Sequence, residues 1–433
     1  MKVSMNPSRR ILVLSNNCFS LTNSNGRTLG SLFEGWPKAN LAQMCVIASD
    51  PNWDLCDNYY CIEDEVMLRS FISLRKAEGR KLVRQPNIKT KEGSANDSKR
   101  TSRVGKKTVI KVSLRELVWG AKRWDSRSFR HWVDDFDPEV VVLQFGDSFF
   151  MLDIAYHIAT TRHIPLVIYN TEGYYFFPRN WHHLSKWDIL VFPIYKRIYH
   201  KKVERVMRIA KHCVYLNDKL KEDYGKVFGN AATVIYNSSD IVSSGAPLFS
   251  GSTPRMCYLG NLGLDRDSGI IEVGEVLHGI NSKYRIEVYG KADDAVRKRF
   301  LEALGVEYKG LVSYEQVKQV IRESDILFHV ETEKGYKERQ LQYAFSTKIA
   351  DSVSSGKCFV VYAPAELACS KYIIDTKAGW YASNKDQLGK VIKMIINDAD
   401  ERAEVLSHAK ITAEKNHSVA KNARLFQDII QNV

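Results

Sequence analysis

The sequence lacks the marks of membrane-spanning and disulfide-stapled proteins. No window reaches the ~18–20 consecutive apolar residues that span a bilayer, and the N-terminal apolar run ILVL (11–14) is too short for a signal peptide. The 8 cysteines include no Cys-x-x-Cys pair, and none lies at zinc-ligand spacing from a histidine. Most of them lie in apolar runs such as AQMCVIA, where a reduced cysteine packs as a small hydrophobe. We therefore expect a cytoplasmic protein, soluble or peripheral, with free thiols.

Nothing in the overall composition is extreme. Of the 433 residues, 44% are hydrophobic and 26% are charged, which is ordinary for globular proteins. These proportions exclude a wholly disordered chain, a collagen-like fibre and a disulfide-dependent miniprotein. At roughly 100–200 residues per domain, the length predicts two or three domains, each able to bury its own core.

The positive charge is concentrated in the first half of the chain. The net charge is +13, and residues 1–240 hold 37 basic against 25 acidic side chains, whereas residues 241–433 hold 26 against 25. This asymmetry predicts that only the N-terminal half meets an acidic partner.

Two segments carry much of this charge. Residues 75–111 hold 13 basic and 3 acidic residues with almost no periodicity, which fits a solvated insertion or an electrostatic tether to a phosphate-rich surface. The segment has no aromatic residue to stack on single-stranded nucleic acid. Residues 181–212 alternate aromatic and aliphatic residues with Lys and Arg, and Pro193 interrupts the run. That pattern fits either the headgroup layer of an anionic membrane or a core-facing helix with a basic outer side.

Short apolar runs alternate with segments of helical period along the whole chain. Strands are expected at 11–15, 44–49, 140–145, 165–170, 213–217 and 233–237, and again at 255–260, 284–290, 306–310, 325–330 and 357–363. Continuous β-branched runs separated by helices are typical of doubly wound parallel sheets. We predict an α/β protein of two Rossmann-like domains, 1–240 and 241–410, joined by a Ser/Gly/Pro-rich linker at 238–254. A C-terminal helix at 411–433 is expected to pack back on the first domain.

A polar loop and a helix start, SNNCFSLTNSNGRTLGSLFEGW (15–36), follow the first strand. Free backbone N–H groups at such a helix start favour an anion or a hydroxyl-rich ligand. Gly26 permits close approach, and Arg27 adds a fork of donors. The segment is not Gly-x-Gly-x-x-Gly, so the dinucleotide fingerprint is missing.

A second polar turn, YLGNLGLDRDSGI (258–270), opens the second domain. A flexible turn followed by an arginine, here Arg266, can hold a diphosphate. An ordinary strand–helix loop with a surface arginine gives the same pattern.

The segment FSTKIADSVSSGKCFVVYAP (345–364) carries the sharpest signal. Ser346 is a plausible N-cap for a helix over 347–355, which Gly356 follows at the C′ position. The N-terminus of this helix and Lys348 predict an anion site, and Asp351 lies one turn further on. A carboxylate there is placed to accept hydrogen bonds from ribose hydroxyls, although a surface carboxylate behind a simple cap fits equally well.

Three motifs occur in order: VIYNSSD (234–240), GNLGLDR (260–266) and STKIADSVSSGK (346–357). Together they resemble the GT-B glycosyltransferases of the retaining family-4 type, particularly bacterial enzymes of surface-polysaccharide assembly. The resemblance covers nearly the whole chain and is strongest over 210–365. It implies two Rossmann-like domains facing across a cleft, with a nucleotide-sugar donor held mainly by the second and the acceptor mainly by the first.

The family's Glu-x7-Glu element falls on Tyr343 and Asp351. Asp351 replaces the glutamate that binds the nucleotide ribose, whereas Tyr343 departs from the glutamate that orients the donor sugar; Glu338 or Glu331 is the substitute the sequence offers. The diphosphate-binding Arg/Lys pair of the family falls on Asn261 and Arg266, so one charge is missing, and Lys348 would restore it. The turn at 310–312 matches the base-contacting position.

These assignments define the candidate site. Its members are Arg266, Lys348 and Glu338 as catalytic residues; Gly260, Asn261, Val312, Ser346, Thr347 and Asp351 as donor-binding residues; and Asn25, Gly26, Arg27 and Glu172 on the acceptor side.

The resemblance implies a hexosyltransferase that moves a sugar from a nucleotide sugar to a lipid-linked or oligosaccharide acceptor in polysaccharide biosynthesis, with retention of configuration. We expect no metal or other cofactor, no nucleic-acid partner, and attachment to the anionic inner face of the cell membrane. Two alternatives remain open. One is a nucleic-acid-binding protein that uses the basic half, and the other is a nucleotide-sugar epimerase with the same fold.

Overall fold

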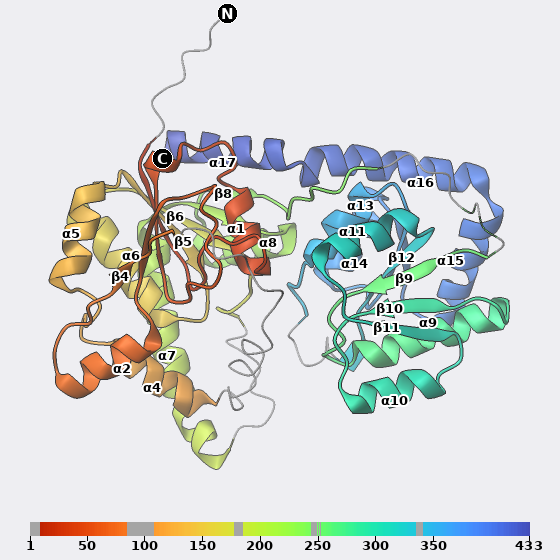
Figure 1. The fold of residues 1–433 in the computed structure, drawn as a ribbon, viewed down its shortest axis with the longest axis horizontal. Helices are drawn as coiled ribbons and strands as arrows, with labels where there is room; N and C mark the ends of the chain where they lie inside the picture. The colour runs from red at the N-terminus through yellow and green to blue at the C-terminus, as the bar shows by residue number, and fades with distance from the viewer. Residues whose placement is uncertain are drawn as a thin grey trace, which may run out of the picture. The chain divides into compact units, whose positions relative to one another are not determined.

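The computed structural model describes residues 9–84, 108–176, 185–243, 249, 251, 253–334 and 341–433 (Figure 1). The chain forms two compact units. The first comprises Met1–Tyr215, Lys221–Val234 and Ala423–Val433, and the second comprises Leu216–Leu220 and Ile235–Asn422. The main part of the second unit begins at Ile235, a few residues before the boundary expected after residue 240.

The first unit is built on an eight-stranded sheet in the order β4-β3-β2-β1-β5-β6-β7-β8. Its strands are β1 (Ile11–Leu14), β2 (Leu41–Cys45), β3 (Asn58–Cys61), β4 (Arg80–Lys81), β5 (Val140–Phe145), β6 (Leu166–Asn170), β7 (Ala210–Tyr215) and β8 (Ala232–Val234). All neighbours are parallel except β3 and β4. Ile11 of β1 lies opposite Leu41 on one side and Val140 on the other. The strands at the centre of the sheet, β1, β5 and β6, are apolar except for Gln144 and Asn170 near their carboxyl ends, as expected where helices cover both faces of a parallel sheet.

The helices of the first unit lie between its strands along the chain. They are α1 (Ser24–Ser31), α2 (Asp64–Ser73), α4 (Val109–Trp119), α5 (Arg127–Phe136), α6 (Phe149–Arg162) and α7 (Lys186–Ile209), with a 3₁₀ turn at Lys38–Asn40. Both α4 and α5 fall between β4 and β5. Two further helices cross the division of the chain, α8 (Asp218–Phe228) and α17 (Val419–Asn432).

Three sequence expectations for the first unit need correction. The strand expected at 44–49 is β2 at Leu41–Cys45, because the chain leaves the sheet after Cys45 and Ile47 bonds instead to the loop carbonyl of Asn16. The segment 75–111, expected to have almost no periodicity, contains β4 (Arg80–Lys81), which pairs with β3, and the start of α4 at Val109. Residues 85–107 lie outside the described residues.

The third correction concerns Pro193, which lies inside α7 and does not interrupt it. A proline removes one helical hydrogen bond and crowds the preceding turn. Pro193 and Ile189, whose carbonyl loses its partner, are both on exposed turns, so water can take the place of the missing donor.

The second unit contains a six-stranded parallel sheet in the order β11-β10-β9-β12-β13-β14. The strands are β9 (Met256–Leu259), β10 (Ile286–Tyr289), β11 (Val306–Gly310), β12 (Ile326–Val330), β13 (Cys358–Tyr362) and β14 (Trp380–Ala382). Its helices are α9 (Arg266–Ile280), α10 (Asp294–Glu302), α11 (Tyr314–Glu323), α13 (Thr347–Ser354), α14 (Ala368–Thr376), α15 (Lys385–Asn397) and α16 (Ala399–Thr412), followed by a π turn at Ala413–His417. The five strands expected here are confirmed to within two residues, and β14 is additional.

The order of this second sheet places β12 beside β9, although β10 and β11 come between them in the chain. The winding direction therefore reverses between β9 and β12. Met256 of β9 lies opposite Ile286 of β10 and Ile326 of β12, and all three are fully buried. In open α/β sheets, ligands bind outside the carboxyl ends of the strands at such a reversal.

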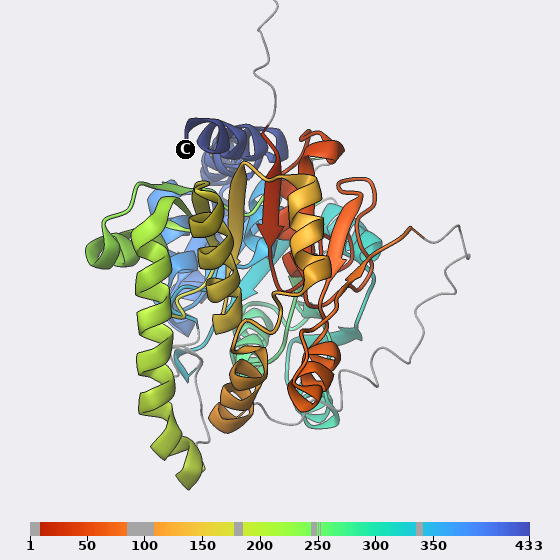
Figure 2. The ribbon, with the colours of Figure 1, turned by 90° about the vertical axis from the view of Figure 1, so that its left-hand side faces the viewer.

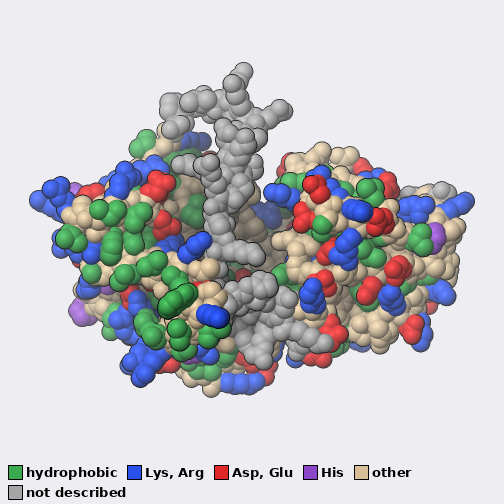
Figure 3. All heavy atoms as spheres, turned by 90° about the horizontal axis from the view of Figure 1, so that it is seen from below, with side chains coloured by type: hydrophobic (Ala, Val, Ile, Leu, Met, Phe, Trp, Pro, Cys, Tyr) green, Lys and Arg blue, Asp and Glu red, His purple; other side chains and the backbone are tan. Residues whose placement is uncertain are grey.

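The surface of the first unit carries a large exposed apolar area. Of the 22 exposed large hydrophobic side chains among the described residues, ten belong to α2, α4, α7 and the residue that ends α2. They are Leu68, Ile72, Leu74, Leu114, Leu117, Trp187, Ile189, Leu190, Ile194 and Ile198. Hydrophobic side chains are seen gathered on this unit in the left half of Figure 3, and the three helices reach the same end of the unit in Figure 2. In the described parts of the chain, no helix combines the length and apolar character that crossing a membrane requires.

Candidate functional site

A buried ion pair lies at the reversal point of the second unit. Arg266 is the first residue of α9, and Glu331 directly follows β12. The guanidinium Nε and Nη2 donate to Glu331 Oε2 and Oε1, each at 2.8 Å, and Nη1 donates to the carbonyl of Gly263 at 3.2 Å. The Arg266 and Glu331 side chains are 12% and 3% exposed. Such a two-pronged pair fixes the guanidinium at the carboxyl ends of β9 and β12.

His329 lies beside this pair. Its Nε2 is 3.4 Å from Glu331 Oε1, and its side chain is buried. Burial, together with the charges of Arg266 and Lys348, lowers the pKa of His329 to about 3, so the imidazole is neutral at ordinary pH. Burial raises the pKa of Glu331, and Arg266 and Lys348 oppose that rise. The ionised site thus holds two cations against one carboxylate.

Gly260 lets Lys348 approach the end of β9. A Cβ at Gly260 would lie 2.9 Å from Tyr258 Oη and 3.3 Å from Lys348 Cε, so the lysine chain passes directly over the glycine. A Cβ at Gly290 would lie only 2.1 Å from the Gly260 carbonyl oxygen. Both glycines are required by close packing, and Lys348 is brought to the same strand end as Arg266.

The turn between β9 and α9 is held by its own side chains. Tyr258 Oη donates to the Asn261 carbonyl at 2.8 Å, and Asn261 Oδ1 accepts from the Gly263 amide at 2.7 Å. Leu264 and Asp265 adopt left-handed backbone conformations, with φ of 61° and 62°. Two such residues in succession store strain, which is commonest at functional sites.

The helix start at 346–348 forms as the sequence predicts. Ser346 Oγ accepts from the Lys348 amide at 3.3 Å, α13 spans Thr347–Ser354, and Gly356 follows with a φ of +73°. Asp351 is buried rather than on the surface, and its Oδ1 accepts from Ser239 Oγ at 2.7 Å. A ribose bound at Asp351 would share this carboxylate with Ser239.

The remaining donor-side candidates are dispersed. Val312 is half-buried in the turn between β11 and the capping box of α11, and Glu338 lies outside the described residues. Tyr343 is buried; its carbonyl accepts from Asn217 Nδ2 at 3.0 Å, and Lys219 Nζ lies 5.5 Å from its ring centre.

On the acceptor side, the helix after β1 begins earlier than the sequence suggests. Asn25, Gly26 and Arg27 lie in the first turn of α1, where Asn23 Oδ1 accepts from the amides of Asn25 (2.9 Å) and Gly26 (3.2 Å). A Cβ at Gly26 would lie 2.4 Å from the Cys18 carbonyl oxygen, so the glycine is required where the helix crosses its own loop. Glu172 is exposed just beyond β6, and its amide donates to Asn170 Oδ1 at 3.0 Å.

The first unit has its own reversal point, between β1 and β5, and sequence analysis missed the residues that line it. Arg115 Nη1 of α4 donates to Ser148 Oγ at 3.1 Å, and Ser148 Oγ donates to Asn16 Oδ1 at 3.2 Å. Glu116 accepts from the amides of Phe149 (2.9 Å) and Phe150 (3.0 Å) at the start of α6. Burial raises the pKa of Glu116 to about 8 against these hydrogen bonds. α4 therefore supplies polar side chains to the carboxyl edge of the first sheet.

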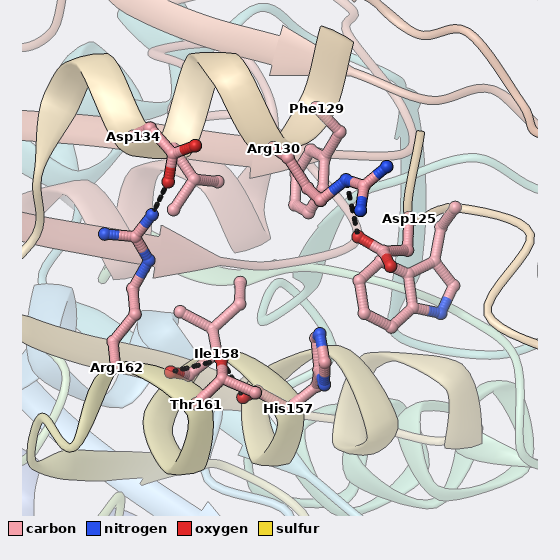
Figure 4. A pocket seen from close by; sticks show the side chains of 10 residues that line it. Asp125, Phe129, Arg130, Asp134, His157, Ile158, Thr161 and Arg162 are labelled. Carbon is pink, nitrogen blue, oxygen red and sulfur yellow. Dashed lines mark hydrogen bonds and ion pairs between the residues drawn. The ribbon is translucent and has the colours of Figure 1, made fainter. Parts of the chain in front are cut away.

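A cavity of about 300 Å³ lies between α5 and α6 (Figure 4). Its charged side chains already neutralise one another, since Arg162 pairs with Asp134 and Arg130 Nε lies 3.8 Å from Asp125 Oδ1. A charged ligand would have to displace one of these pairs, so the cavity is a weaker candidate than either reversal point.

His329, which lies beside the Arg266–Glu331 pair, was not among the candidates taken from the sequence. A polar residue at the carboxyl end of an otherwise apolar strand, as in DILFHVE (325–331), was the available signal. Across the described stretches of the chain, no group of three or more His, Cys, Asp or Glu side chains is arranged to hold a metal ion.

The family model that matches this protein covers residues in the same half of the chain as the Arg266–Glu331 pair. Residues 274–428 match a family model described as glycosyl transferase-like. The structure resembles HepE of Anabaena, solved in complex with UDP, with 13% identity and a TM-score of 0.61 over 98% of this chain and 100% of that one. The fold is that of the GT-B glycosyltransferases. The matched residues include His329, Glu331, Lys348 and Asp351, whereas Arg266 lies just before them.

Two further structural neighbours are described with different activities. WaaG, a glycosyltransferase involved in lipopolysaccharide biosynthesis, is 11% identical with a TM-score of 0.55 over 97% of this chain and 99% of that one. A Listeria monocytogenes protein assigned as a UDP-N-acetylglucosamine 2-epimerase is 11% identical with a TM-score of 0.52 over 96% of this chain and 94% of that one. No curated protein matches the chain by sequence.

The buried histidines give a first prediction. Burial lowers the pKa of His329 to about 3 and that of His417 to about 4. The His417 Nδ1–H donates to the Asn237 carbonyl at 2.7 Å, and Nε2 accepts from Tyr372 Oη at 2.7 Å. Because the unfolded chain takes up these protons first, the contribution of these two histidines to stability is expected to fall as pH drops below about 6.5. NMR of the histidine ring protons, assigned with His329→Asn and His417→Asn, should show no titration of either between pH 5 and 8. A midpoint near pH 6 would contradict the structure.

Proposed function

We propose that the protein is a glycosyltransferase that binds a nucleotide sugar in its second unit and transfers the sugar to a lipid-linked saccharide. The observation that carries the proposal is the convergence of Arg266, Lys348 and the start of α13 at the reversal point between β9 and β12. The leaving group of a nucleotide sugar is a diphosphate, which needs positive charge and free N–H groups at such a place.

The main contribution that this reaction requires from the protein is electrostatic. As the anomeric C–O bond breaks, negative charge grows on the diphosphate, and Arg266 and Lys348 are placed to stabilise it. His329 is neutral, so the positive charge at this place comes from Arg266 and Lys348. Glu331 holds Arg266 in position and substitutes for the glutamate missing at Tyr343, the role that the sequence also allowed for Glu338.

We further propose that the anomeric configuration is retained, with the acceptor attacking from the face that the diphosphate leaves. NMR of the newly formed anomeric centre distinguishes this outcome from inversion.

The acceptor side rests on the first unit. Its carboxyl edge offers Asn16, Ser148 and Arg115, together with the α1 start at 25–27. The basic excess of residues 1–240 suits a saccharide carried on an anionic lipid diphosphate. The similarity to WaaG, a lipopolysaccharide enzyme, points in the same direction.

A thermal-shift series with nucleoside diphosphates and nucleotide sugars, followed by product analysis, tests the proposal. A ligand at 100 times its Kd raises stability by about 2.7 kcal/mol. Transfer to an added acceptor supports a glycosyltransferase. Conversion of the donor sugar without any acceptor would instead establish an epimerase, the alternative favoured by the Listeria neighbour. Salt-dependent binding of DNA or RNA with no nucleotide-sugar binding would favour the nucleic-acid alternative.

Asp351 gives a prediction for the ribose site. If its carboxylate accepts from ribose hydroxyls, Asp351→Asn should weaken every nucleotide sugar by about 1–3 kcal/mol, regardless of the sugar attached. Ser239→Ala serves as the control, because it removes the hydrogen bond to Asp351 without removing the carboxylate. Calorimetry with a nucleoside diphosphate and its sugar derivative measures both variants. Weakening confined to one sugar would assign Asp351 to the sugar ring.

A further inference from the structure

The three helices α2, α4 and α7 form one apolar face at the carboxyl edge of the first sheet. The exposed and buried residues of α7 show which side of this helix belongs to the face. Trp187, Leu190, Ile194 and Ile198 are spaced three and four residues apart and so share one side of the helix, with exposures of 69%, 66%, 63% and 46%. Tyr195, Tyr199 and Val203 lie on another side and are buried.

The N-terminal part of α7 projects beyond its neighbour. The rings of Tyr195 and Tyr199 pack on Phe149, the first residue of α6, with centres 4.6 and 4.7 Å apart. Further along, Lys202 Nζ pairs with Asp153 at 2.5 Å, so the two helices run in the same direction. Lys186–Ile194 therefore extend past α6 by ~13 Å, and Figure 2 shows this end of α7, in yellow-green, reaching beyond the sheet.

α4 and α2 continue the same face. Asp188 Oδ1 accepts from the Ile110 amide at 3.1 Å and so ties the first turn of α4 to the first turn of α7. At the other end of α4, Trp119 Nε1 donates to Asp64 Oδ1 of α2 at 2.8 Å. Leu114 and Leu117 of α4 are 54% and 59% exposed, whereas Arg115 and Glu116 between them bond to the sheet edge.

Ten exposed hydrophobic side chains on three adjoining helices mark an interaction site, because exposed hydrophobic residues on monomers are usually scattered singly. The charge of its surroundings identifies the partner. Over the three helices, at 64–73, 109–119 and 186–202, the sequence has eight basic residues and four acidic ones, Asp64, Glu65, Glu116 and Asp188. Three of these carboxylates are engaged within the unit: Asp64 accepts from Arg115 and Trp119, and Glu116 and Asp188 accept from backbone amides. An apolar stripe with tryptophan among basic residues fits the headgroup and acyl boundary of an anionic bilayer.

We infer that the face formed by α2, α4 and α7 inserts into the surface of an anionic membrane. The aliphatic residues of α7 enter the acyl region, and the basic residues beside them contact the headgroups. The sequence left 181–212 open between a membrane-contacting stretch and a core-facing helix. Tyr195 and Tyr199 pack in the core, Trp187 is exposed, and Trp181 lies outside the described residues. The inference deepens the proposed function, because the hydrogen bonds from Arg115 place this face next to the edge proposed for a lipid-linked acceptor.

Vesicle co-sedimentation of the full-length protein tests the inference without requiring catalysis. The vesicles are phosphatidylcholine alone, or phosphatidylcholine with 30% phosphatidylglycerol. Wild-type protein is expected to bind the anionic vesicles, more weakly as salt rises, and the exposed-residue variant Leu190→Glu/Ile194→Glu should bind at least tenfold more weakly. The matched control is Leu301→Glu/Leu304→Glu on the second unit, at 85% and 61% exposure, which should bind as wild type does.

Tryptophan fluorescence provides a second readout. Anionic vesicles are expected to shift the emission to shorter wavelength, and Trp187→Phe should remove most of this shift while Trp53→Phe preserves it. Equal vesicle binding by wild type and Leu190→Glu/Ile194→Glu would overturn the inference, as would no binding to anionic vesicles at low salt. A dimer of the wild type that this double variant dissociates would assign the face to a second copy of the chain instead. Transfer to a soluble acceptor should be unchanged in the double variant, and its absence in wild type would contradict only the proposed function.

Discussion

Arg266→Ala is expected to weaken binding of a nucleoside diphosphate by about 1–3 kcal/mol, the usual contribution of charge-assisted hydrogen bonds. The variant should also destabilise the second unit. Glu331 would remain as a buried carboxylate without its two-pronged partner, and breaking such a pair costs about 3–5 kcal/mol. Isothermal titration with the diphosphate and urea unfolding measure the two effects separately.

Glu331→Gln distinguishes the two roles of Arg266. It removes the carboxylate charge that Arg266 faces, so the guanidinium is released toward the diphosphate, and affinity should stay level or rise while stability falls. The double variant Arg266→Ala/Glu331→Gln should recover part of the stability of Arg266→Ala but none of its affinity. The changes in the free energy of unfolding of the two single variants and the double variant give the coupling energy between the two side chains.

A matched control lies at the opposite end of the same strand. Arg255 precedes β9 and pairs with Glu287 at 3.0 Å, away from the carboxyl edge. Arg255→Ala is expected to lower stability and leave diphosphate affinity unchanged. Wild-type diphosphate affinity in Arg266→Ala, or an equal affinity loss in Arg255→Ala, would remove Arg266 from the donor site.

The parallel sheets were predictable because their central strands are buried on both faces. Runs such as VVVLQF (140–145) and DILFHV (325–330) have no polar alternation, and each forms a central strand. β3 (NYYC), β4 (RK) and β14 (WYA) are short, lie at or next to sheet edges, and carry no comparable run. Pairing with a neighbour, rather than local sequence, creates these strands.

The caps and glycines of the candidate donor site were predictable from the sequence, but the ion pair between Arg266 and Glu331 was not. Caps and glycines are local signals, so Ser346, Gly356 and the start of α13 follow from the sequence. The Arg266–Glu331 pair joins residues 65 positions apart and depends on β12 lying beside β9. The same holds for Arg115, Ser148 and Asn16, which meet only because β5 pairs with β1.

The α4 contact with the first sheet gives the second large prediction. Glu116 accepts two amides at the start of α6, and burial raises the pKa of this carboxyl group to about 8. Between its ordinary pKa near 4.5 and 8, the folded state holds a proton that the unfolded chain has released. Stability from this group is therefore present at low pH and is lost as pH rises through that window.

Wild-type stability is accordingly expected to fall relative to Glu116→Gln between pH 5 and 8, by at most about 1.4 kcal/mol per pH unit. At pH 5 the amide resembles the protonated acid in shape, but it offers a single acceptor oxygen to two amides. The variant should therefore be about 1–3 kcal/mol less stable there. Urea unfolding at a series of pH values measures the difference, with Glu65→Gln on exposed α2 as the control that leaves its pH dependence unchanged. Parallel stability curves for wild type and Glu116→Gln across this range would show that Glu116 is ionised in the folded protein, and α4 would then meet the sheet edge with a full negative charge.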